Sequence, residues 1–169
     1  TSELVVVRGV DAIEGNSSAE KMKQLRNHIH AQETQLSHIA VDWACWDDAY
    51  RFMQDNNDDF VRTNLRQQML AKLNLSSIAY VSRDAVNVHM VEDDAGWRKP
   101  GHTAEVQRLY GQLVNRLEGS SEEGLAGIMM IGSMPHLVAA QKIRDTAMLL
   151  PANGVVFMTR AIDADFIKD

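Results

Sequence analysis

The chain has 169 residues, of which 45% are hydrophobic and 24% are charged, a composition typical of an ordinary globular protein. This length suits one domain with a sizeable core. The formal net charge is −6 and no basic run occurs, which argues against binding to nucleic acid or to an anionic membrane surface. A single cysteine, Cys45, excludes an internal disulfide and a cysteine-built zinc site.

The beginning of the chain carries no targeting pattern. No apolar run approaches the ~20 residues that a membrane-spanning helix needs, and no signal peptide opens the sequence. The first residues, Thr1-Ser2-Glu3, lack a methionine, so we expect a fragment excised from a longer protein. Residues 4–14 are predicted to form a helix, before a break at residues 15–18.

A long helix is predicted from Ser18 onward, because neither glycine nor proline occurs between residues 17 and 95. Large side chains recur there at alternating steps of three and four, a heptad-like seam with one polar interruption. The seam consists of Met22, Leu25, Ile29, Gln32, Leu36, Ile39, Trp43, Trp46, Tyr50 and Met53. Two interpretations are open: a helix packed on its own domain, or a helix that pairs in a dimer and carries a signal along its axis.

The remainder of the chain is predicted to be mostly β-structure. A turn at residues 55–59 ends the first helical element, and a second amphipathic helix spans residues 60–73. A hairpin, a short helix and three further strands follow. Their expected ranges are 78–81 and 86–91 for the hairpin, 106–117 for the helix, and 125–131, 136–143 and 154–161 for the strands.

This order of elements predicts an α+β fold. The expected architecture is a long N-terminal helix followed by a PAS-like domain with a five-stranded antiparallel sheet. We expect a single domain over residues 1–169, with a long helical region at 1–56 and an α/β sensor core at 57–169.

Residues 41–52 concentrate two of the three tryptophans, one tyrosine and three aspartates. On a continuous helix, with ~100° per residue, Asp47 shares a face with Trp43, Trp46 and Tyr50, whereas Asp48 lies well round the helix. Aromatic groups would then point to both sides, so the helix is either enclosed by the domain or broken near residues 47–48. A carboxylate in an aromatic stripe needs a partner. Asp47 is expected to cap a second helix, to bond a tryptophan N–H or to face a ligand amine.

Signatures of catalysis and of metal binding are missing from the sequence. Residues 55–59 place oxygens as a calcium loop does, but Phe60 replaces the required glycine and Arg66 the required glutamate. The histidines show no ligand spacing, and no nucleophile motif or phosphate-binding loop occurs. We therefore predict no catalytic residues, no metal, no cofactor and no enzymatic activity for this chain.

The stretch Asp42-Trp43-Ala44, then Trp46-Asp47-Asp48, Tyr50 and Phe52, resembles a known signature. Extracellular CHASE-type sensor domains of the fourth class carry Asp-Trp-Ala-x-Trp-Asp-Asp-x-Tyr-x-Phe at the end of a long first helix. The resemblance continues through residues 60–65 and the later strands. It departs at residues 82–85, where the family often has Asp-x-Asp-Gly and this chain has Ser-Arg-Asp-Ala.

The resemblance implies a periplasmic domain held between two membrane helices of a bacterial receptor. Its contact with the membrane would run only through those flanking helices, which this sequence does not contain. The output module of such receptors is typically a diguanylate cyclase, a cyclic-di-GMP phosphodiesterase or a histidine kinase. The resemblance implies the sensory part alone. We further expect a homodimer through the N-terminal helix in the full-length receptor.

The favoured function is the sensing of an unidentified small molecule in a pocket lined by sheet residues and roofed by the aromatic stretch. The predicted ligand-binding residues are Trp46, Asp47, Tyr50, Trp43 and Asp48. The alternative is a protein-interaction or structural signalling module without a small ligand, in which the aromatic stretch is core. A pocket beside the aromatic stretch would distinguish the two.

Overall fold

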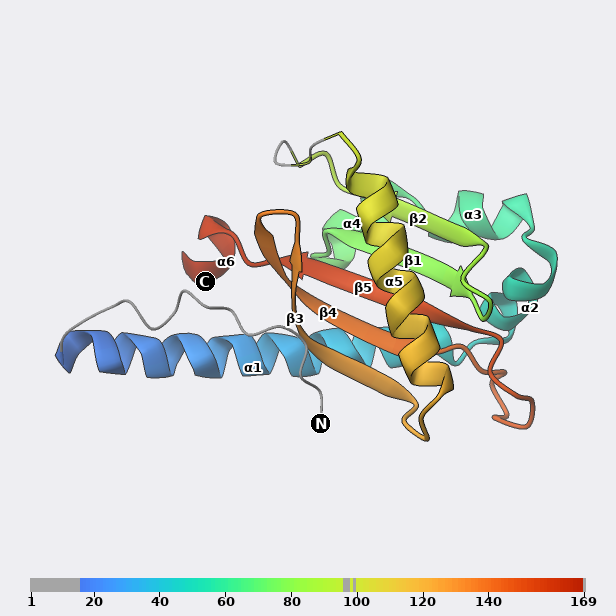
Figure 1. Cartoon of the computed structure of the whole chain (residues 1–169), viewed down its shortest axis with the longest axis horizontal. Helices are drawn as coiled ribbons and strands as arrows, with labels where there is room; N and C mark the ends of the chain where they lie inside the picture. Colours follow the sequence, from blue (N-terminus) through green and yellow to red (C-terminus); the bar gives the residue numbers. More distant parts are fainter. Residues whose placement is uncertain (1–15, 96–97, 99, 169) are drawn as a thin grey trace.

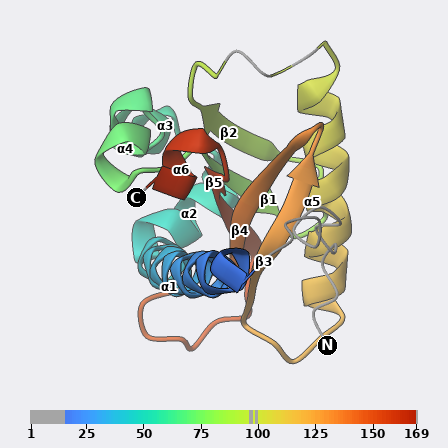
Figure 2. The ribbon, with the colours of Figure 1, turned by 90° about the vertical axis from the view of Figure 1, so that its left-hand side faces the viewer.

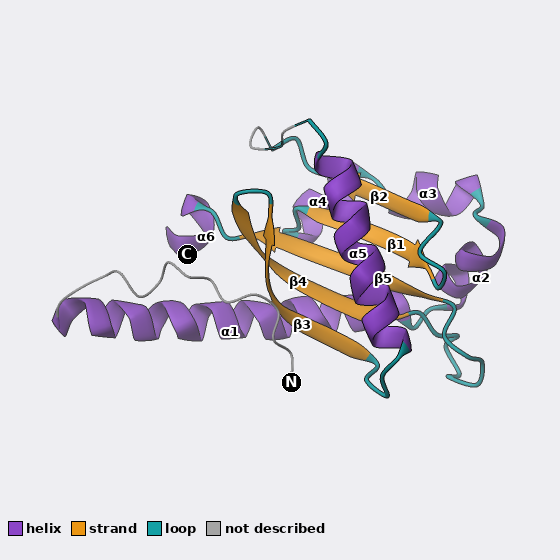
Figure 3. Ribbon diagram, in the orientation of Figure 1, coloured by secondary structure: helices purple, strands orange, loops and turns teal. Residues whose placement is uncertain are grey.

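The computed structural model describes residues 16–95, 98 and 100–168. Six helices and five strands follow one another in the described part of the chain (Figures 1 and 3). In order they are α1 (Asn16–Ala44), α2 (Asp47–Asp55), α3 (Asp58–Asn64), α4 (Gln67–Leu73), β1 (Ser77–Ser82), β2 (Val88–Glu92), α5 (His102–Glu118), β3 (Gly124–Ile131), β4 (Met134–Lys142), β5 (Gly154–Ala161) and α6 (Ala164–Lys168). The predicted long N-terminal helix is confirmed.

The five strands form one antiparallel sheet in the order β2-β1-β5-β4-β3, which confirms the predicted sheet. The last strand in sequence, β5, is therefore the central one, and all but its final residue are buried. Its run of β-branched and aromatic residues suits a strand with neighbours on both sides. The antiparallel pairs β1–β2 and β3–β4 flank it. The predicted hairpin is present as the pair β1–β2.

The sheet separates two apolar cores, because successive strand residues point to opposite faces. Figure 2 shows α1 to α4 and α6 on one side of the sheet and α5 on the other. On the α1 side, Leu36 packs with Tyr80 and Val156, and none of these three side chains is exposed. On the α5 side, the ring of Tyr110 stacks on Phe157 with centroids 4.2 Å apart. Helix α1 thus packs on its own domain.

Helix α1 ends at Ala44, and the chain is extended at Trp46, with φ −146° and ψ 127°. Cys45 forms a parallel β-bridge with Arg144, and the N–H of Arg144 donates to the carbonyl of Ala44 at 3.1 Å. The chain after β4 therefore hydrogen-bonds to a backbone carbonyl that a continuous helix would bond internally. Of the two expected possibilities, the break is the one found, one or two residues before Asp47-Asp48.

The predicted second helix over 60–73 is wrong in its continuity, since two short helices, α3 and α4, occupy that stretch. Asn57 caps the first of them by accepting the N–H of Phe60 at 2.8 Å. Leu65 leaves the helical conformation and Arg66 is extended, so α4 begins anew. Asn74 then ends α4 in the left-handed region with φ +53°, a conformation that asparagine tolerates well.

Other elements lie close to their predicted ranges. The second hairpin strand begins at Val88 and not at residue 86, because Ala85 takes a left-handed φ of +60° and the turn extends to Asn87. Helix α6 was not predicted, since its five residues are too few for a periodic pattern. The helix predicted for residues 4–14 lies outside the described residues. Among the helices that the structure describes, none is long and apolar enough to cross a membrane.

Candidate functional site

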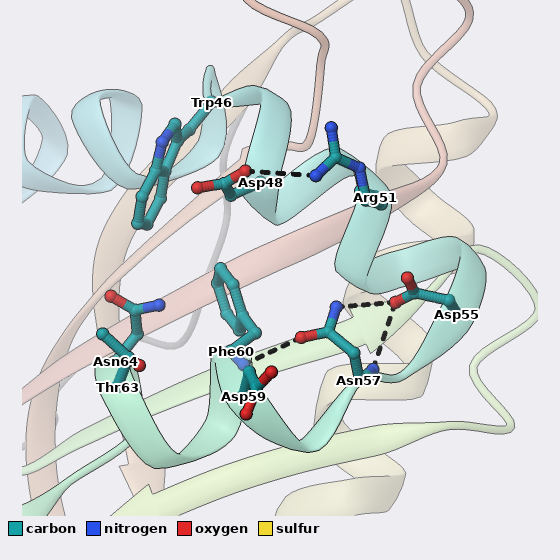
Figure 4. A pocket seen from close by; sticks show the side chains of 9 residues that line it. All are labelled: Trp46, Asp48, Arg51, Asp55, Asn57, Asp59, Phe60, Thr63 and Asn64. Atoms are coloured by element: carbon teal, nitrogen blue, oxygen red, sulfur yellow. Dashed lines mark hydrogen bonds and ion pairs between the residues drawn. The ribbon is translucent and has the colours of Figure 1, made fainter.

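A hollow of about 390 Å³ lies beside the break between α1 and α2, where α2 and α3 face each other (Figure 4). A volume of this size suits a small molecule. Its lining consists of Trp46, Asp48, Arg51, Asp55, Asn57, Asp59, Phe60, Thr63 and Asn64. Two of the five predicted ligand-binding residues, Trp46 and Asp48, therefore line it.

Two aromatic side chains form the apolar part of the hollow. The rings of Trp46 and Phe60 lie 5.6 Å apart at an angle of 49°. Behind them, Phe52 stacks on Phe60 at 4.4 Å and meets Tyr80 of the sheet edge to face at 5.9 Å. Phe52 and Tyr80 are fully buried, so the core of the domain supports the aromatic wall. Trp46 itself is only half-buried, which leaves part of the indole accessible.

Carboxylates dominate the polar part of the lining. Three aspartates stand against one arginine, a formal charge of −2. Asp59 bonds Arg62, and Asp55 accepts the backbone N–H and the side-chain amide of Asn57 at 3.1 and 2.7 Å. Asp48 has a looser partner, Arg51, at 3.7 Å, and both side chains are more than half exposed. Such an exposed ion pair is weak. Asp48 is therefore the carboxylate most easily recruited by a ligand next to Trp46 (Figure 4).

Asp47 and Tyr50 lie elsewhere, against the β4–β5 loop (residues 143–153). Asp47 Oδ1 accepts the N–H of Thr146 at 2.8 Å, and Tyr50 Oη donates to the carbonyl of Pro151 at 2.7 Å. The side-chain amide of Asn153 donates to the carbonyl of Tyr50 at 2.9 Å. We call these three hydrogen bonds the loop latch. The expectation that Asp47 shares the aromatic face is wrong, because the break at residues 45–46 resets the helical phase.

Beyond the fully buried Ile143, the loop held by the latch has little apolar packing of its own. Met148, Leu149 and Leu150 are 50%, 83% and 47% exposed. The carboxylate of Asp145 accepts the N–H groups of Leu149 and Leu150, and Arg144 Nη1 donates to the carbonyl of Leu150. Hydrogen bonds to the Asp145 carboxylate lower its pKa. Polar contacts, not burial, therefore fix the shape of this loop.

Trp43 packs against the core and does not line the hollow. It is half-buried, meets Trp46 edge to face at 6.3 Å, and packs against the α1-side core. Its carbonyl accepts the hydroxyl of Tyr80 at 3.1 Å. Trp43 thus joins the end of α1 to the sheet and to the aromatic wall.

A second polar cluster lies on the opposite face of the sheet, where β2 ends and α5 begins. Glu92 contacts both Arg98 and His102 at 2.6 Å, and Arg98 also pairs with Asp93 at 2.6 Å. The side chains of Glu92, Arg98 and His102 are at most 20% exposed. Their charges compensate one another locally, as buried charges require.

His136 of β4 belongs to the same face and is 1% exposed. Its Nδ1 donates to the carbonyl of Met134 at 2.9 Å. Burial lowers the pKa of His136, and the nearby positive charge of Arg98 acts in the same direction. Burial therefore favours the neutral imidazole in the folded protein.

Several residues of the hollow and of the Glu92 cluster were not predicted as functional. For Phe60 a signal existed, since it belongs to the stretch that resembles the family. Glu92 and Arg98 lie between the predicted hairpin and the predicted helix of residues 106–117, and nothing in the local pattern indicates that they meet. No group of three or more His, Cys, Asp or Glu side chains suited to a metal occurs among the described residues.

Comparisons with known proteins place this geometry in context. The family model described as the CHASE4 domain matches residues 28–169. A sequence search of curated proteins gave no match. Among solved structures, the sensor domain of the Vibrio cholerae histidine kinase DctB is similar, with a TM-score of 0.52 and 12% identity over 90% of this chain and 57% of that chain.

A second similar structure is the ligand-binding domain of the Pseudomonas aeruginosa PAO1 amino acid chemoreceptor PctC in complex with GABA. Its TM-score is 0.47, with 10% identity over 88% of this chain and 63% of that chain. The chain therefore spans less than two thirds of either structure. The likeness to the DctB domain confirms the predicted PAS-like fold.

Proposed function

Since the chain belongs to the CHASE4 family of extracytoplasmic sensing domains of signalling receptors, we propose that it senses a small molecule. The proposal places the ligand in the hollow between α2 and α3, next to Trp46 and Asp48. The observation that carries it is the combination of an accessible indole, a second aromatic ring and a loosely paired carboxylate in one cavity.

The lining favours a small organic cation. An aromatic face attracts a cation by about 0.5–1 kcal/mol at exposed sites and by about 2 when the cation is desolvated. The formal charge of −2 on the lining raises the local concentration of cations and repels anions. A ligand amine that pairs with Asp48 only has to displace the weak contact to Arg51.

In this proposal the five predicted residues divide into two roles. Trp46 and Asp48 contact the ligand. Trp43, Asp47 and Tyr50 support the site from behind, because Trp43 braces the indole and the loop latch fixes the start of α2. Binding between α2 and α3 would change how these helices stand at the end of α1. Such a shift signals only if the ligand prefers one arrangement of the helices.

The output is part of the same proposal. We propose that the chain itself has no catalytic activity and that it controls a cyclic-di-GMP enzyme or a histidine kinase in the cytoplasm of a bacterium. The sensing domain would lie in the periplasm, between flanking membrane helices, and α1 would form the homodimer contact of the full-length receptor. Nucleic acid has no part in this function.

The test is calorimetric titration of the 169-residue chain with putrescine, spermidine and choline. We expect one of these cations to bind, about tenfold more weakly to Trp46→Ala, which corresponds to about 1.4 kcal/mol. Asp48→Asn should weaken binding several-fold and reduce its salt dependence. Light scattering during the same titration reports whether the ligand changes the oligomeric state.

The matched control is Asp42→Asn, because Asp42 is also an exposed carboxylate, lies near the end of α1 and does not line the hollow. This variant should bind as the unmodified chain does. The proposal fails if none of the cations binds, or if Trp46→Ala and Asp48→Asn bind with unchanged affinity.

A further inference from the structure

A separate cavity of about 230 Å³ lies where the middle of α1, the end of β5 and α6 come together. Figures 1 and 2 show α6 on the same side of the sheet as α1. The two helices touch through His28, whose Nε2 bonds the carbonyl of Phe166 at 3.1 Å and whose ring lies 4.8 Å from the phenyl ring. The polar lining includes Gln32, Asp93, Arg160, Asp163 and Asp165.

Arg160 forms the floor of this cavity and bonds only neutral groups. Its Nε donates to the carbonyl of Asn74 at 2.7 Å, and Nη2 donates to the carbonyl of Leu73 at 3.2 Å. Nη1 donates to the side-chain oxygens of Gln32 and Gln35. A guanidinium has five N–H donors. These four bonds leave one Nη2 hydrogen without an acceptor among the described residues.

The charge of Arg160 is also without a counter-ion. The residue is only 4% exposed, yet none of the ion pairs among the described residues includes it. Buried charges are normally paired, because removing an ion from water is costly. Burial lowers the pKa of this guanidinium. A cavity beside a buried, uncompensated cation is suited to an anionic group.

The rim of the same cavity carries the opposite charge. Asp163 and Asp165 lie on the α6 side, and their present partners leave carboxylate oxygens accessible. Asp163 Oδ1 caps α6 by accepting the N–H of Phe166 at 2.9 Å, and Asp165 has only a long contact of 4.0 Å to Lys168. Asp93 on the other side already pairs with Arg98 at 2.6 Å. Positive floor and negative rim therefore stand across one cavity.

We propose that this cavity binds a small zwitterion with a carboxylate and a protonated amine, such as an amino acid. The carboxylate accepts the remaining Nη2 hydrogen of Arg160, and the ammonium lies between Asp163 and Asp165. Water occupies about 30 Å³ per molecule in the liquid, so the cavity has room for a ligand of several non-hydrogen atoms. The lone cation and the carboxylates act on opposite ends of the ligand.

This site goes beyond the proposed function, because it is distinct from the α2–α3 hollow and selects a different class of ligand. Its ligand would contact α1, β5 and α6 together. Binding would therefore stabilise the contact of α1 with α6, the first and last described helices. The energy available for this is the difference in ligand affinity between the docked and the separated α6.

The experiment titrates the 169-residue chain with glycine, β-alanine and 5-aminopentanoate, and in parallel with acetate and ethylamine, followed by calorimetry and by amide NMR shifts. We expect at least one zwitterion to bind at least tenfold more tightly than acetate or ethylamine. The shifted amides should lie around residues 28, 160 and 165.

Two variants separate the ends of the ligand. Arg160→Gln should abolish binding of the zwitterion. Because Arg160 is buried and this variant can fail to fold, the exposed Asp165→Asn provides the second test. This variant should bind the zwitterion at least threefold more weakly and acetate with unchanged affinity. Trp46→Ala should bind the zwitterion normally, which keeps this result apart from that of the α2–α3 hollow.

The proposal is overturned if no zwitterion binds the unmodified chain, if acetate binds as tightly as the zwitterions, or if Asp165→Asn leaves their affinity unchanged. It is also overturned if the amide shifts cluster around residues 46–64. Failure of the cations in the α2–α3 hollow leaves these outcomes untouched.

Discussion

Asp47 and Asp48 are neighbours with the same chemistry, but their side chains make different contacts in the structure. Both lie in the first turn of α2, so both carboxylates interact with its N-terminal dipole. Only Asp47 also accepts a hydrogen bond from the β4–β5 loop, at Thr146. Replacing each by asparagine removes the same charge from the same helix end, and at residue 47 it also turns the charged acceptor of the Thr146 N–H into a weaker, neutral one. The difference between the two variants therefore isolates the latch.

The magnitude follows from the latch geometry. A net contribution of about 1 kcal/mol is usual for one intramolecular hydrogen bond, and more when one partner is charged and buried. Asp47→Asn weakens an exposed bond by removing its charge, and Tyr50→Phe removes a neutral, part-buried bond, so we assign about 1 kcal/mol to each change. Asp47→Asn combined with Tyr50→Phe should thus lower the free energy of unfolding by about 2 kcal/mol. For a chain of this size that lowers Tm by roughly 4–8 °C.

The assays are urea unfolding and amide hydrogen exchange. In Asp47→Asn the amide of Thr146 should exchange about five times faster, which corresponds to about 1 kcal/mol of local opening. Asp48→Asn should leave exchange in residues 144–153 unchanged. The loop is sensitive because Met148, Leu149 and Leu150 are exposed and do not anchor it.

The latch reasoning is refuted if Asp47→Asn and Asp48→Asn lower stability equally and Thr146 exchanges at the same rate in both. If Asp47→Asn instead weakens cation binding more than Asp48→Asn while the loop exchanges normally, Asp47 is a ligand group and the role of the pair is reversed.

Two further predictions concern the cores. Leu36→Ala should destabilise the domain by about 2–5 kcal/mol, because Leu36 is fully buried between α1 and the sheet. The control Val41→Ala, at a 39% exposed position of the same helix, should destabilise it far less. Equal, small effects of the two variants in urea unfolding would mean that α1 does not pack on its own sheet. The pKa of His136 is lower in the folded than in the unfolded chain, so the unfolded state binds more protons as the pH falls. The stability contributed by neutral His136 is therefore lost as the pH falls below about 6.5, the usual pKa of histidine, toward the lower folded pKa. Unfolding between pH 7.5 and 5.5 should show this decline, and His136→Gln should flatten it relative to the exposed control His30→Gln; parallel profiles for both variants would contradict the assignment.

Local patterns accounted for most of the elements and for part of the site. The β-branched run of residues 154–161 and the absence of glycine and proline before residue 96 are short-range signals; the strand formed as predicted, and the long helix formed but ends at Ala44. Trp46 was expected to contact the ligand and does line the hollow. Arg160 was overlooked, although an arginine within an apolar strand is itself a signal that the charge has a dedicated environment.

The sequence by itself determined the long first helix, the succession of five strands, the antiparallel sheet and the family, because these depend on periodicity and on a contiguous motif. Only the tertiary structure decided which aspartate lines the hollow. A helical wheel assumes one unbroken helix, but Arg144, a hundred residues downstream, takes the carbonyl of Ala44 and ends α1 there. The phase of every later side chain changes with that contact. Asp47 therefore holds the β4–β5 loop, and Asp48 stands beside Trp46.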